Sequence, residues 1–133
     1  MGEALYTGKT AIITGSTQGL GEAIARKLTA EQASGITISG RNSERGKALA
    51  EELTQQGTPT IFVRAELENP DECSNLVSQS YKHFGRLDGL VNSAAITTRG
   101  TLEDTTVKLW DQHMAINVRA PFLTMQEAVK VMQ

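Results

Sequence analysis

A glycine-rich stretch near the start of the chain, residues 14–21, constrains the fold more than any other feature. The apolar run Thr10–Ile13 precedes it and is predicted to be a buried strand. Apolar side chains at helical spacing follow it, which predicts an amphipathic helix. The inner face of this helix is expected to carry Leu20, Ala23, Ile24 and Leu28. Glycines let a backbone turn approach a ligand closely, and a helix N-terminus offers unpaired N–H groups to a phosphate. We therefore interpret the turn as a nucleotide pyrophosphate site; the alternative is that its glycines only shape a loop.

The composition favours a single soluble domain. At 133 residues the chain can bury a substantial core, and we expect residues 1–133 to form one domain. Its 13 basic and 15 acidic side chains nearly balance, so no nucleic-acid-binding surface is predicted. The one cysteine, Cys73, favours a reducing compartment. No apolar run approaches the ~18 residues of a membrane span, and the first residues do not match a signal peptide. These features predict a cytoplasmic protein without a membrane partner.

Strand-like and helix-like segments alternate along the rest of the chain. Further strands are predicted at residues 36–38, 60–63 and 87–91, and helices at 43–56 and from Asn69 onward. Gly57 is expected to end the second helix in a left-handed conformation, and Asn69 with Pro70 to begin the third. Residues 102–133 are helical in pattern, and we expect one short and one long helix there.

This alternation predicts the fold class. Strands separated by helices of this length form parallel sheets with right-handed crossovers. Because the glycine turn follows the first strand, we predict an α/β, Rossmann-type doubly wound sheet with strand order 3-2-1-4. Its ligand is expected at the switch point between the first and fourth strands.

Three separated motifs resemble those of the short-chain dehydrogenases/reductases. Residues 14–21 fit the T-G-x-x-x-G-x-G turn of that family. Residues 92–95, Asn-Ser-Ala-Ala, resemble its N-N-A-G segment, from which Ser93 and Ala95 depart. Residues 117–122 look like its N-V-x-x-x-F segment. The resemblance covers essentially the whole chain, and three motifs in order are far more specific than one glycine motif.

The resemblance implies a nicotinamide dinucleotide, and the end of the second strand predicts which one. Enzymes that use NAD usually place an acidic residue about 20 residues past the glycine turn. Residues 38–42 contain no carboxylate, whereas Arg41 offers a charged fork suited to a 2′-phosphate. We therefore expect NADP(H) to be preferred over NAD(H). The alternative is that Arg41 is an ordinary solvated side chain. The resemblance also shows one departure: Gln18 stands where NADP-preferring relatives often carry a basic residue.

The resemblance also implies further contacts. Glu66 stands where the family commonly has an aspartate that contacts the adenine amino group, unless it is only a surface glutamate. Asn92 is expected to hold neighbouring backbone turns beside the cofactor, unless it is only a turn former. The complete expected cofactor-binding set is Thr14, Gly15, Ser16, Thr17, Gln18, Gly19, Leu20, Gly21, Arg41, Asn42, Glu66, Leu67, Asn92 and Ala94. No metal site is predicted, because neither histidine has a Cys or His neighbour in the sequence.

The family's hydride-transfer chemistry uses a Ser, a Tyr and a Lys in a Tyr-x-x-x-Lys pattern. Tyr6 and Tyr81 are the only tyrosines, and neither begins such a pattern. Asn117 is the one member of the catalytic set that the resemblance carries over; its alternative role is to disturb the helix backbone. We expect the cofactor-binding part of an oxidoreductase for a carbonyl or secondary alcohol substrate. Its Ser and Tyr-x-x-x-Lys would lie beyond this chain, which alone is expected to be inactive. The alternatives are a non-catalytic dinucleotide-binding module and an inactive fragment.

Two apolar surfaces are expected to lack cover within the chain. The fourth strand would be a bare sheet edge, because the family's later strands are absent. The last helix is too apolar to be wholly solvated. Its apolar residues are Ile116, Val118, Phe122, Leu123 and Met125. We expect either a part of a longer polypeptide, truncated before those strands, or a homo-oligomer formed through the long C-terminal helix.

Overall fold

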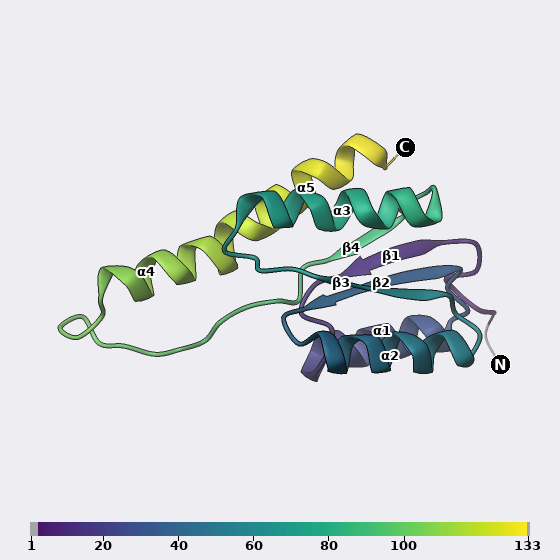
Figure 1. Cartoon of the computed structure of the whole chain (residues 1–133), viewed down its shortest axis with the longest axis horizontal. Helices are drawn as coiled ribbons and strands as arrows, with labels where there is room; N and C mark the ends of the chain where they lie inside the picture. Colours follow the sequence, from purple (N-terminus) through teal and green to yellow (C-terminus); the bar gives the residue numbers. More distant parts are fainter. Residues whose placement is uncertain (1–2, 133) are drawn as a thin grey trace.

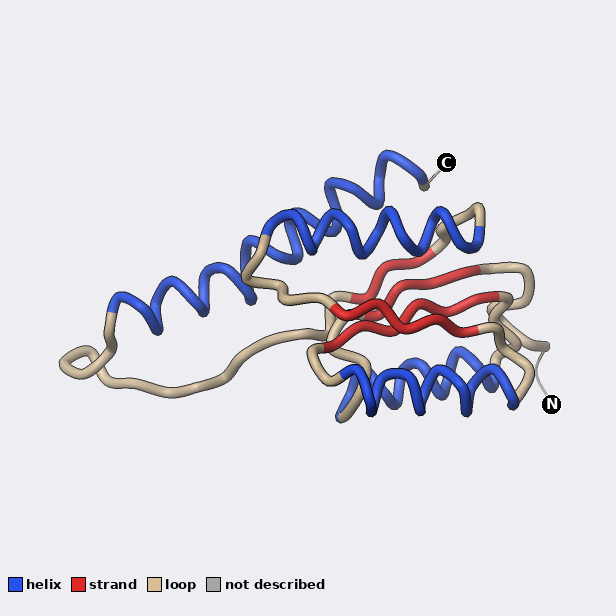
Figure 2. Tube along the Cα trace, in the orientation of Figure 1, coloured by secondary structure: helices blue, strands red, loops and turns tan. Residues whose placement is uncertain are grey.

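A computed structural model describes residues 3–132, in which strands and helices alternate before a long helical segment (Figures 1 and 2). The strands are β1 (Thr10–Ile13), β2 (Gly35–Gly40), β3 (Thr60–Arg64) and β4 (Gly89–Val91). The helices between them are α1 (Gly19–Ala30), α2 (Ser43–Gln55) and α3 (Pro70–Phe84). A helical segment follows that consists of α4 (Val107–Met114), the π-helical turn η1 (Ala115–Arg119) and α5 (Ala120–Val131).

The four strands form one parallel sheet in the order β3-β2-β1-β4. Ala11 lies between Ile36 of β2 and Gly89 of β4, so β1 is central and β4 is an edge. Helices α1 and α2 cover one face, while α3 and α5 cover the other (Figure 1). This arrangement confirms the predicted doubly wound α/β sheet and its strand order.

Each face of the sheet has its own apolar core, because successive side chains of a strand point to opposite faces. Ile13, Ile36 and Ile38 pack with Leu49 and Leu53 on the side of α1 and α2. On the other side a second cluster joins β1 to α3 and α5. It consists of Ile12, Leu76, Val77, Leu87 and Ala128. Burial on both faces explains why β1 and β2 show no alternation of buried and exposed positions.

The predicted helix ends are confirmed in α2 and α3. The side chain of Asn69 accepts a hydrogen bond from the backbone N–H of Asp71 at 2.9 Å, and Pro70 begins the helix. Gly57 follows α2 with a φ of 111°, in the region that favours glycine.

The predicted inner face of α1 is partly wrong. Leu20 is 72% exposed and Ala23 is also exposed, whereas Ala25 is fully buried. Gly21 and Ala25, four residues apart, form the side that meets the sheet and the glycine turn. These small residues let the helix approach closely, which turns the larger side chains to its flanks.

The segment from 102 to 133 contains a shorter and a longer α-helix, α4 and α5, as expected, but the helical structure begins later and the two helices are joined by η1. Residues 102–106 are not helical; the backbone N–H of Thr101 donates to the Asp104 carboxylate at 2.6 Å and closes a turn. Helical structure then continues from Val107 to Val131, and α4 with its preceding loop extends beyond the sheet (Figures 1 and 2). Residue 133 lies outside the described residues. No helix in the part of the chain that the structure describes is long and apolar enough to cross a bilayer.

The π turn lies at Asn117, where a disturbed helix backbone is predicted. The backbone N–H of Ala120 donates to the carbonyl of Ala115, five residues earlier. Pro121 has no N–H to give to the carbonyl of Asn117, four residues earlier, so a regular α-helical ladder cannot form here. The disturbance is confirmed, but Pro121 accounts for it, because the Asn117 side chain is bonded elsewhere.

One side of the helical segment presents a continuous row of exposed apolar side chains, which we call the apolar stripe. It consists of Val107, Trp110, Met114, Val118, Phe122, Met125 and Val129. Their spacing of three or four residues keeps them on one face. The expectation that Val118, Phe122 and Met125 lack cover is therefore confirmed within the described residues, and Ile116 and Leu123 are half-buried.

The salt bridge beside β4 predicts a dependence of stability on pH. Arg86 donates two hydrogen bonds to Asp88, at 2.7 and 2.8 Å, and the backbone N–H of Thr10 donates to the same carboxylate at 2.8 Å. These bonds, led by that of Arg86, hold the pKa of Asp88 below its usual range. Their stabilising effect is therefore complete above the unfolded-state pKa of about 3.9 and is lost as pH falls through the lower folded-state pKa.

Asp88→Asn should accordingly lower the midpoint of urea unfolding at pH 7, and the difference from the unmodified chain should shrink steadily below about pH 4. Urea titrations of both proteins across this pH range measure the effect. A difference that stays constant down to pH 2.5 would contradict this account.

Candidate functional site

A pocket of about 370 Å³ opens at the carboxyl end of the sheet, where the strand order predicts the ligand site. The glycine turn after β1, the ends of β2 and β3, the segment after β4 and one residue of η1 form its walls. The lining residues are Gly15, Thr17, Gln18, Gly19, Leu20, Gly21, Ser39, Gly40, Arg41, Ala65, Glu66, Leu67, Ser93, Ala94, Ala95, Ile96 and Ile116. The pocket thus brings together ten of the fourteen predicted cofactor-binding residues.

Two glycines of the turn stand where no side chain fits. Gly15 has a φ of 58°, and a Cβ there would lie 2.7 Å from the Cα of Ala94. A Cβ on Gly21 would overlap the carbonyl oxygen of Gly15. The turn, the start of α1 and the segment after β4 therefore pack backbone against backbone. This close packing forms the floor of the pocket.

Thr14 and Ser16 lie behind this floor rather than on the wall. The Ser16 hydroxyl donates to the carbonyl of Ile13 at 2.7 Å and accepts from the backbone N–H of Ser39 at 2.9 Å. The Thr14 hydroxyl accepts from the backbone N–H groups of Ser93 and Ala94, at 3.0 and 3.1 Å. Both side chains are buried and tie the turn to its neighbouring strands. Their geometry gives them a structural role in the site.

The N-terminus of α1 borders the pocket. Gln18 is the N-cap residue, but its side chain makes no capping hydrogen bond. The backbone N–H groups of Gly19, Leu20 and Gly21 have no partner within the helix, and all three residues line the pocket. Unpaired N–H groups and the helix dipole favour an anionic group at this place.

Two arginines stand near the end of β2. Arg41 is exposed, lines the pocket and forms no salt bridge within residues 3–132. Arg45, in the first turn of α2, donates a hydrogen bond from Nη1 to Oε1 of Gln18 at 2.6 Å. Asn42 is off the pocket wall and caps α2, accepting from the backbone N–H of Arg45 at 3.0 Å. The Arg45 contact is absent from the sequence-based prediction.

The loop after β3 supplies the pocket wall opposite the segment after β4. Glu66 is half-buried, and its carboxylate accepts a hydrogen bond from Arg64 at 3.2 Å. Its backbone N–H donates to the Glu72 carboxylate at 3.0 Å. The carbonyl of Leu67 accepts from the Cys73 thiol at 3.4 Å, and burial raises the pKa of that thiol. Cys73 is therefore a core residue.

Two asparagines fasten the segment after β4 without lining the pocket. The Asn92 side chain accepts a hydrogen bond from the Thr124 hydroxyl of α5 at 2.8 Å. Asn117 accepts from the backbone N–H of Ile96 and donates to its carbonyl, both at 2.9 Å. Ile96 and the η1 residue Ile116 both line the pocket. The Asn117 amide therefore joins two parts of the pocket wall, the segment after β4 and η1.

Seven lining residues were missed: Ser39, Gly40, Ala65, Ser93, Ala95, Ile96 and Ile116. Gly40 and Ala65 stand at the carboxyl ends of their strands, so the rule that ligands bind at this edge could have found them. Ile96 lines the pocket where its backbone is bonded to the Asn117 amide, 21 residues away in sequence, and no local pattern indicates that contact.

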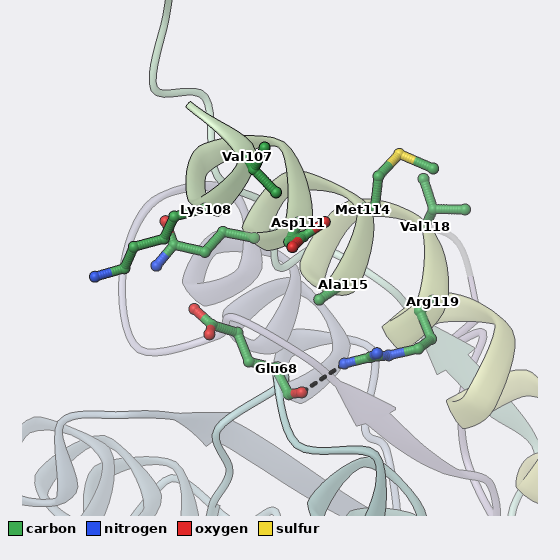
Figure 3. A pocket seen from close by; sticks show the side chains of 9 residues that line it. Glu68, Val107, Lys108, Asp111, Met114, Ala115, Val118 and Arg119 are labelled. Carbon is green, nitrogen blue, oxygen red and sulfur yellow. Dashed lines mark hydrogen bonds between the residues drawn. The ribbon is translucent and has the colours of Figure 1, made fainter. Parts of the chain in front are cut away.

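A second, more open pocket of about 750 Å³ lies between the loop before α3 and the α4–η1 segment (Figure 3). The Arg119 guanidinium donates to the backbone carbonyl of Glu68 at 2.6 Å across it. Lys108 and Asp111 add opposite charges to its rim. In the part of the chain that the structure describes, no three Cys, His, Asp or Glu side chains converge on a metal site.

The family model described as "short chain dehydrogenase" matches residues 9–133. An uncharacterized oxidoreductase of Thermotoga maritima is 34% identical over 128 residues, which are 96% of this chain and 50% of that protein. The structure of a blue fluorescent protein from a metagenomic library, in complex with NADPH, superposes with a TM-score of 0.90 at 34% identity and covers 95% of this chain and 52% of its own. A Burkholderia cenocepacia short chain dehydrogenase in complex with NADP gives a TM-score of 0.91 at 34% identity, over 95% of this chain and 51% of its own.

The chain therefore spans about half the length of the relatives it matches. The match covers all three sequence motifs, and the parallel sheet with its glycine turn reproduces the architecture of the solved relatives. This protein belongs to the short-chain dehydrogenase family, whose members are oxidoreductases that bind NAD(P).

Proposed function

We propose that this chain is the cofactor-binding part of an NADP(H)-preferring oxidoreductase. The observation that carries the preference is Arg41, which lines the pocket at the end of β2 and has no carboxylate partner within the described residues. No acidic side chain follows β2 directly to bind the ribose hydroxyls of NAD or to repel a 2′-phosphate. A guanidinium matches the planar, bidentate geometry of phosphate oxygens.

Each part of the pocket suits one part of the dinucleotide. The N-terminus of α1 and the backbone of the glycine turn suit the pyrophosphate. Glu66 and Leu67 lie on the β3 side, where we place the adenine, and Ala94 with Ile96 lies on the β4 side, where we place the nicotinamide. Two related proteins of known structure hold NADPH and NADP, which supports this proposal.

The proposed reaction is hydride transfer between the nicotinamide and the carbon of a carbonyl or secondary alcohol. Reduction adds the hydride to that carbon and a proton to its oxygen, so it requires a proton donor near the pocket. We propose that the Tyr of the family's Tyr-x-x-x-Lys pattern donates this proton, and that this Tyr, the Lys and the family's Ser lie outside the 133-residue sequence. Asn117, held against Ile96, is the residue of this chain that we assign to their vicinity.

The 133-residue polypeptide should bind NADPH at least about tenfold more tightly than NADH and should not oxidise NADPH with any carbonyl compound. The first part follows from Arg41 and the second from the missing proton donor. Fluorescence titration of both nucleotides measures binding, and loss of absorbance at the nicotinamide band, with a panel of ketones and aldehydes, measures turnover.

Clear turnover by this polypeptide would contradict the assignment of the proton donor. Equal binding of both nucleotides would contradict the cofactor preference. If the gene encodes a longer protein that lacks Tyr-x-x-x-Lys, and that protein binds NADPH in preference to NADH, the result would favour a non-catalytic dinucleotide-binding module.

The apolar stripe supports a further part of the proposal, that copies of the protein assemble through the long helical segment. Trp110 and Phe122 are 61% and 57% exposed, and the stripe runs without a charged residue from α4 through α5. A patch of this kind is usually covered in solution.

A further inference from the structure

We propose that Arg45 is a second determinant of 2′-phosphate recognition and acts together with Gln18. This inference rests on the proposed preference for NADP(H). It concerns a position in the first turn of α2 that does not itself line the pocket but touches a residue that does.

The backbone and side chain of Arg45 are both held in place. The N-cap residue Asn42 accepts a hydrogen bond from the Arg45 N–H at 3.0 Å, which anchors the start of α2. The guanidinium Nη1 reaches Oε1 of Gln18 at 2.6 Å, across 27 residues of sequence. Arg45 therefore bridges α2 and the glycine turn at the side of the pocket where Arg41 stands.

This bridge determines which way the Gln18 amide points. Arginine can only donate, so the Gln18 oxygen faces Arg45 and the –NH₂ group is left to act as a donor. Within residues 3–132 no hydrogen bond involves that –NH₂ group. A guanidinium bonded to the amide oxygen also polarises the amide and strengthens its N–H groups as donors. Gln18 thus offers a polarised donor at the pocket wall.

The charges around the pocket favour the same ligand. Arg26, Arg64 and Arg86 each pair with a carboxylate. Arg45, like Arg41, has no such partner among the described side chains. One arginine without a carboxylate partner, Arg45, therefore bonds to the Gln18 amide, and a second, Arg41, lines the same pocket. A phosphate dianion is the group that three donors of this kind suit.

This arrangement accounts for a neutral residue in the glycine turn. Gln18 carries no charge of its own, and Arg45 supplies one from the neighbouring helix through the 2.6 Å contact. Arg41 then contacts the 2′-phosphate directly, while Arg45 is a positioning residue for Gln18 and adds a longer-range attraction.

Isothermal titration of NADP⁺ and NAD⁺ against Arg45→Met tests the proposal. We expect NADP⁺ binding to weaken five- to tenfold and NAD⁺ binding to change less than twofold. Gln18→Glu, which keeps the pairing with Arg45 but neutralises it, should also weaken NADP⁺ selectively. Lys47→Met, at an exposed position of the same helix, is the matched control and should leave both affinities within twofold. Circular dichroism checks that each variant is folded.

The two proposals fail in different ways. If the unmodified chain prefers NADP⁺ and Arg41→Met abolishes that preference, but Arg45→Met does not alter it, the role of Arg45 is overturned and the proposed function stands. Equal weakening of NADP⁺ and NAD⁺ by Arg45→Met would give the residue a merely structural role and also overturn the inference. If the unmodified chain binds both nucleotides equally, or neither, both proposals are wrong.

Discussion

Replacing Arg41 with aspartate should weaken NADPH binding about a hundredfold while changing NADH binding less than about threefold. Hydrogen bonds to charged groups contribute about 1.5–3 kcal/mol, and the new carboxylate would repel the 2′-phosphate as well. The same carboxylate can accept hydrogen bonds from the ribose hydroxyls of NADH, which compensates for other losses. Fluorescence titrations of both nucleotides measure the ratio.

Two further variants separate the causes of this effect. Arg41→Met removes the guanidinium without adding repulsion and should give an intermediate loss of NADPH affinity. Lys47→Asp makes the same change of charge on α2 away from the pocket wall and should affect neither nucleotide strongly. If Arg41→Asp weakens NADPH and NADH equally, Arg41 does not bind the 2′-phosphate.

Gly21→Ala should abolish nucleotide binding and lower the free energy of unfolding by about 3 kcal/mol. The new methyl group would overlap the backbone of Gly15 and Ser16, which cannot yield as a flexible side chain does. The start of α1 would have to move away from the turn, and its N–H groups would leave the pyrophosphate site. Urea unfolding and NADPH titration measure the two effects.

Gly85→Ala is the matched control. Gly85 has a φ of 74° and open space around its Cβ position, so alanine there carries only the left-handed backbone cost of about 1–2 kcal/mol. Gly85 stands between α3 and the amino end of β4, whereas the pocket lies at the carboxyl ends of the strands, so nucleotide binding should persist. A Gly21→Ala protein as stable as Gly85→Ala, or one that still binds NADPH tightly, would show that the close packing of the turn is not required.

The sequence predicts the topology well, because strand order follows from local patterns and the chirality of parallel crossovers. It also locates the turn and Arg41 at the same edge of the sheet. The inner face of α1 is not predictable in this way, because Gly21 and Ala25, rather than the larger Leu20, determine how closely the helix packs. A pattern of large apolar residues does not reveal contacts that depend on small residues.

Contacts between distant segments are the other part that the sequence does not give. The hydrogen bond from Arg45 to Gln18 depends on how α1 and α2 lie on the sheet. The hydrogen bonds between Asn117 and Ile96 depend on the path of the segment after β4. Thr14 and Ser16 belong to the predicted motif, but their burial and hydrogen bonds place them behind the pocket. A motif therefore identifies the residues of a site more reliably than it assigns their individual roles.

The π turn η1 has a consequence for the width of the pocket. Asn117 binds the backbone of Ile96, in the segment after β4, and Arg119 binds the backbone of Glu68, in the loop after β3. These two segments form opposing walls, and the residues that hold them stand only two positions apart. One turn of helix thus sets the spacing of both walls, so a shift of that turn would open or narrow the entrance on both sides at once.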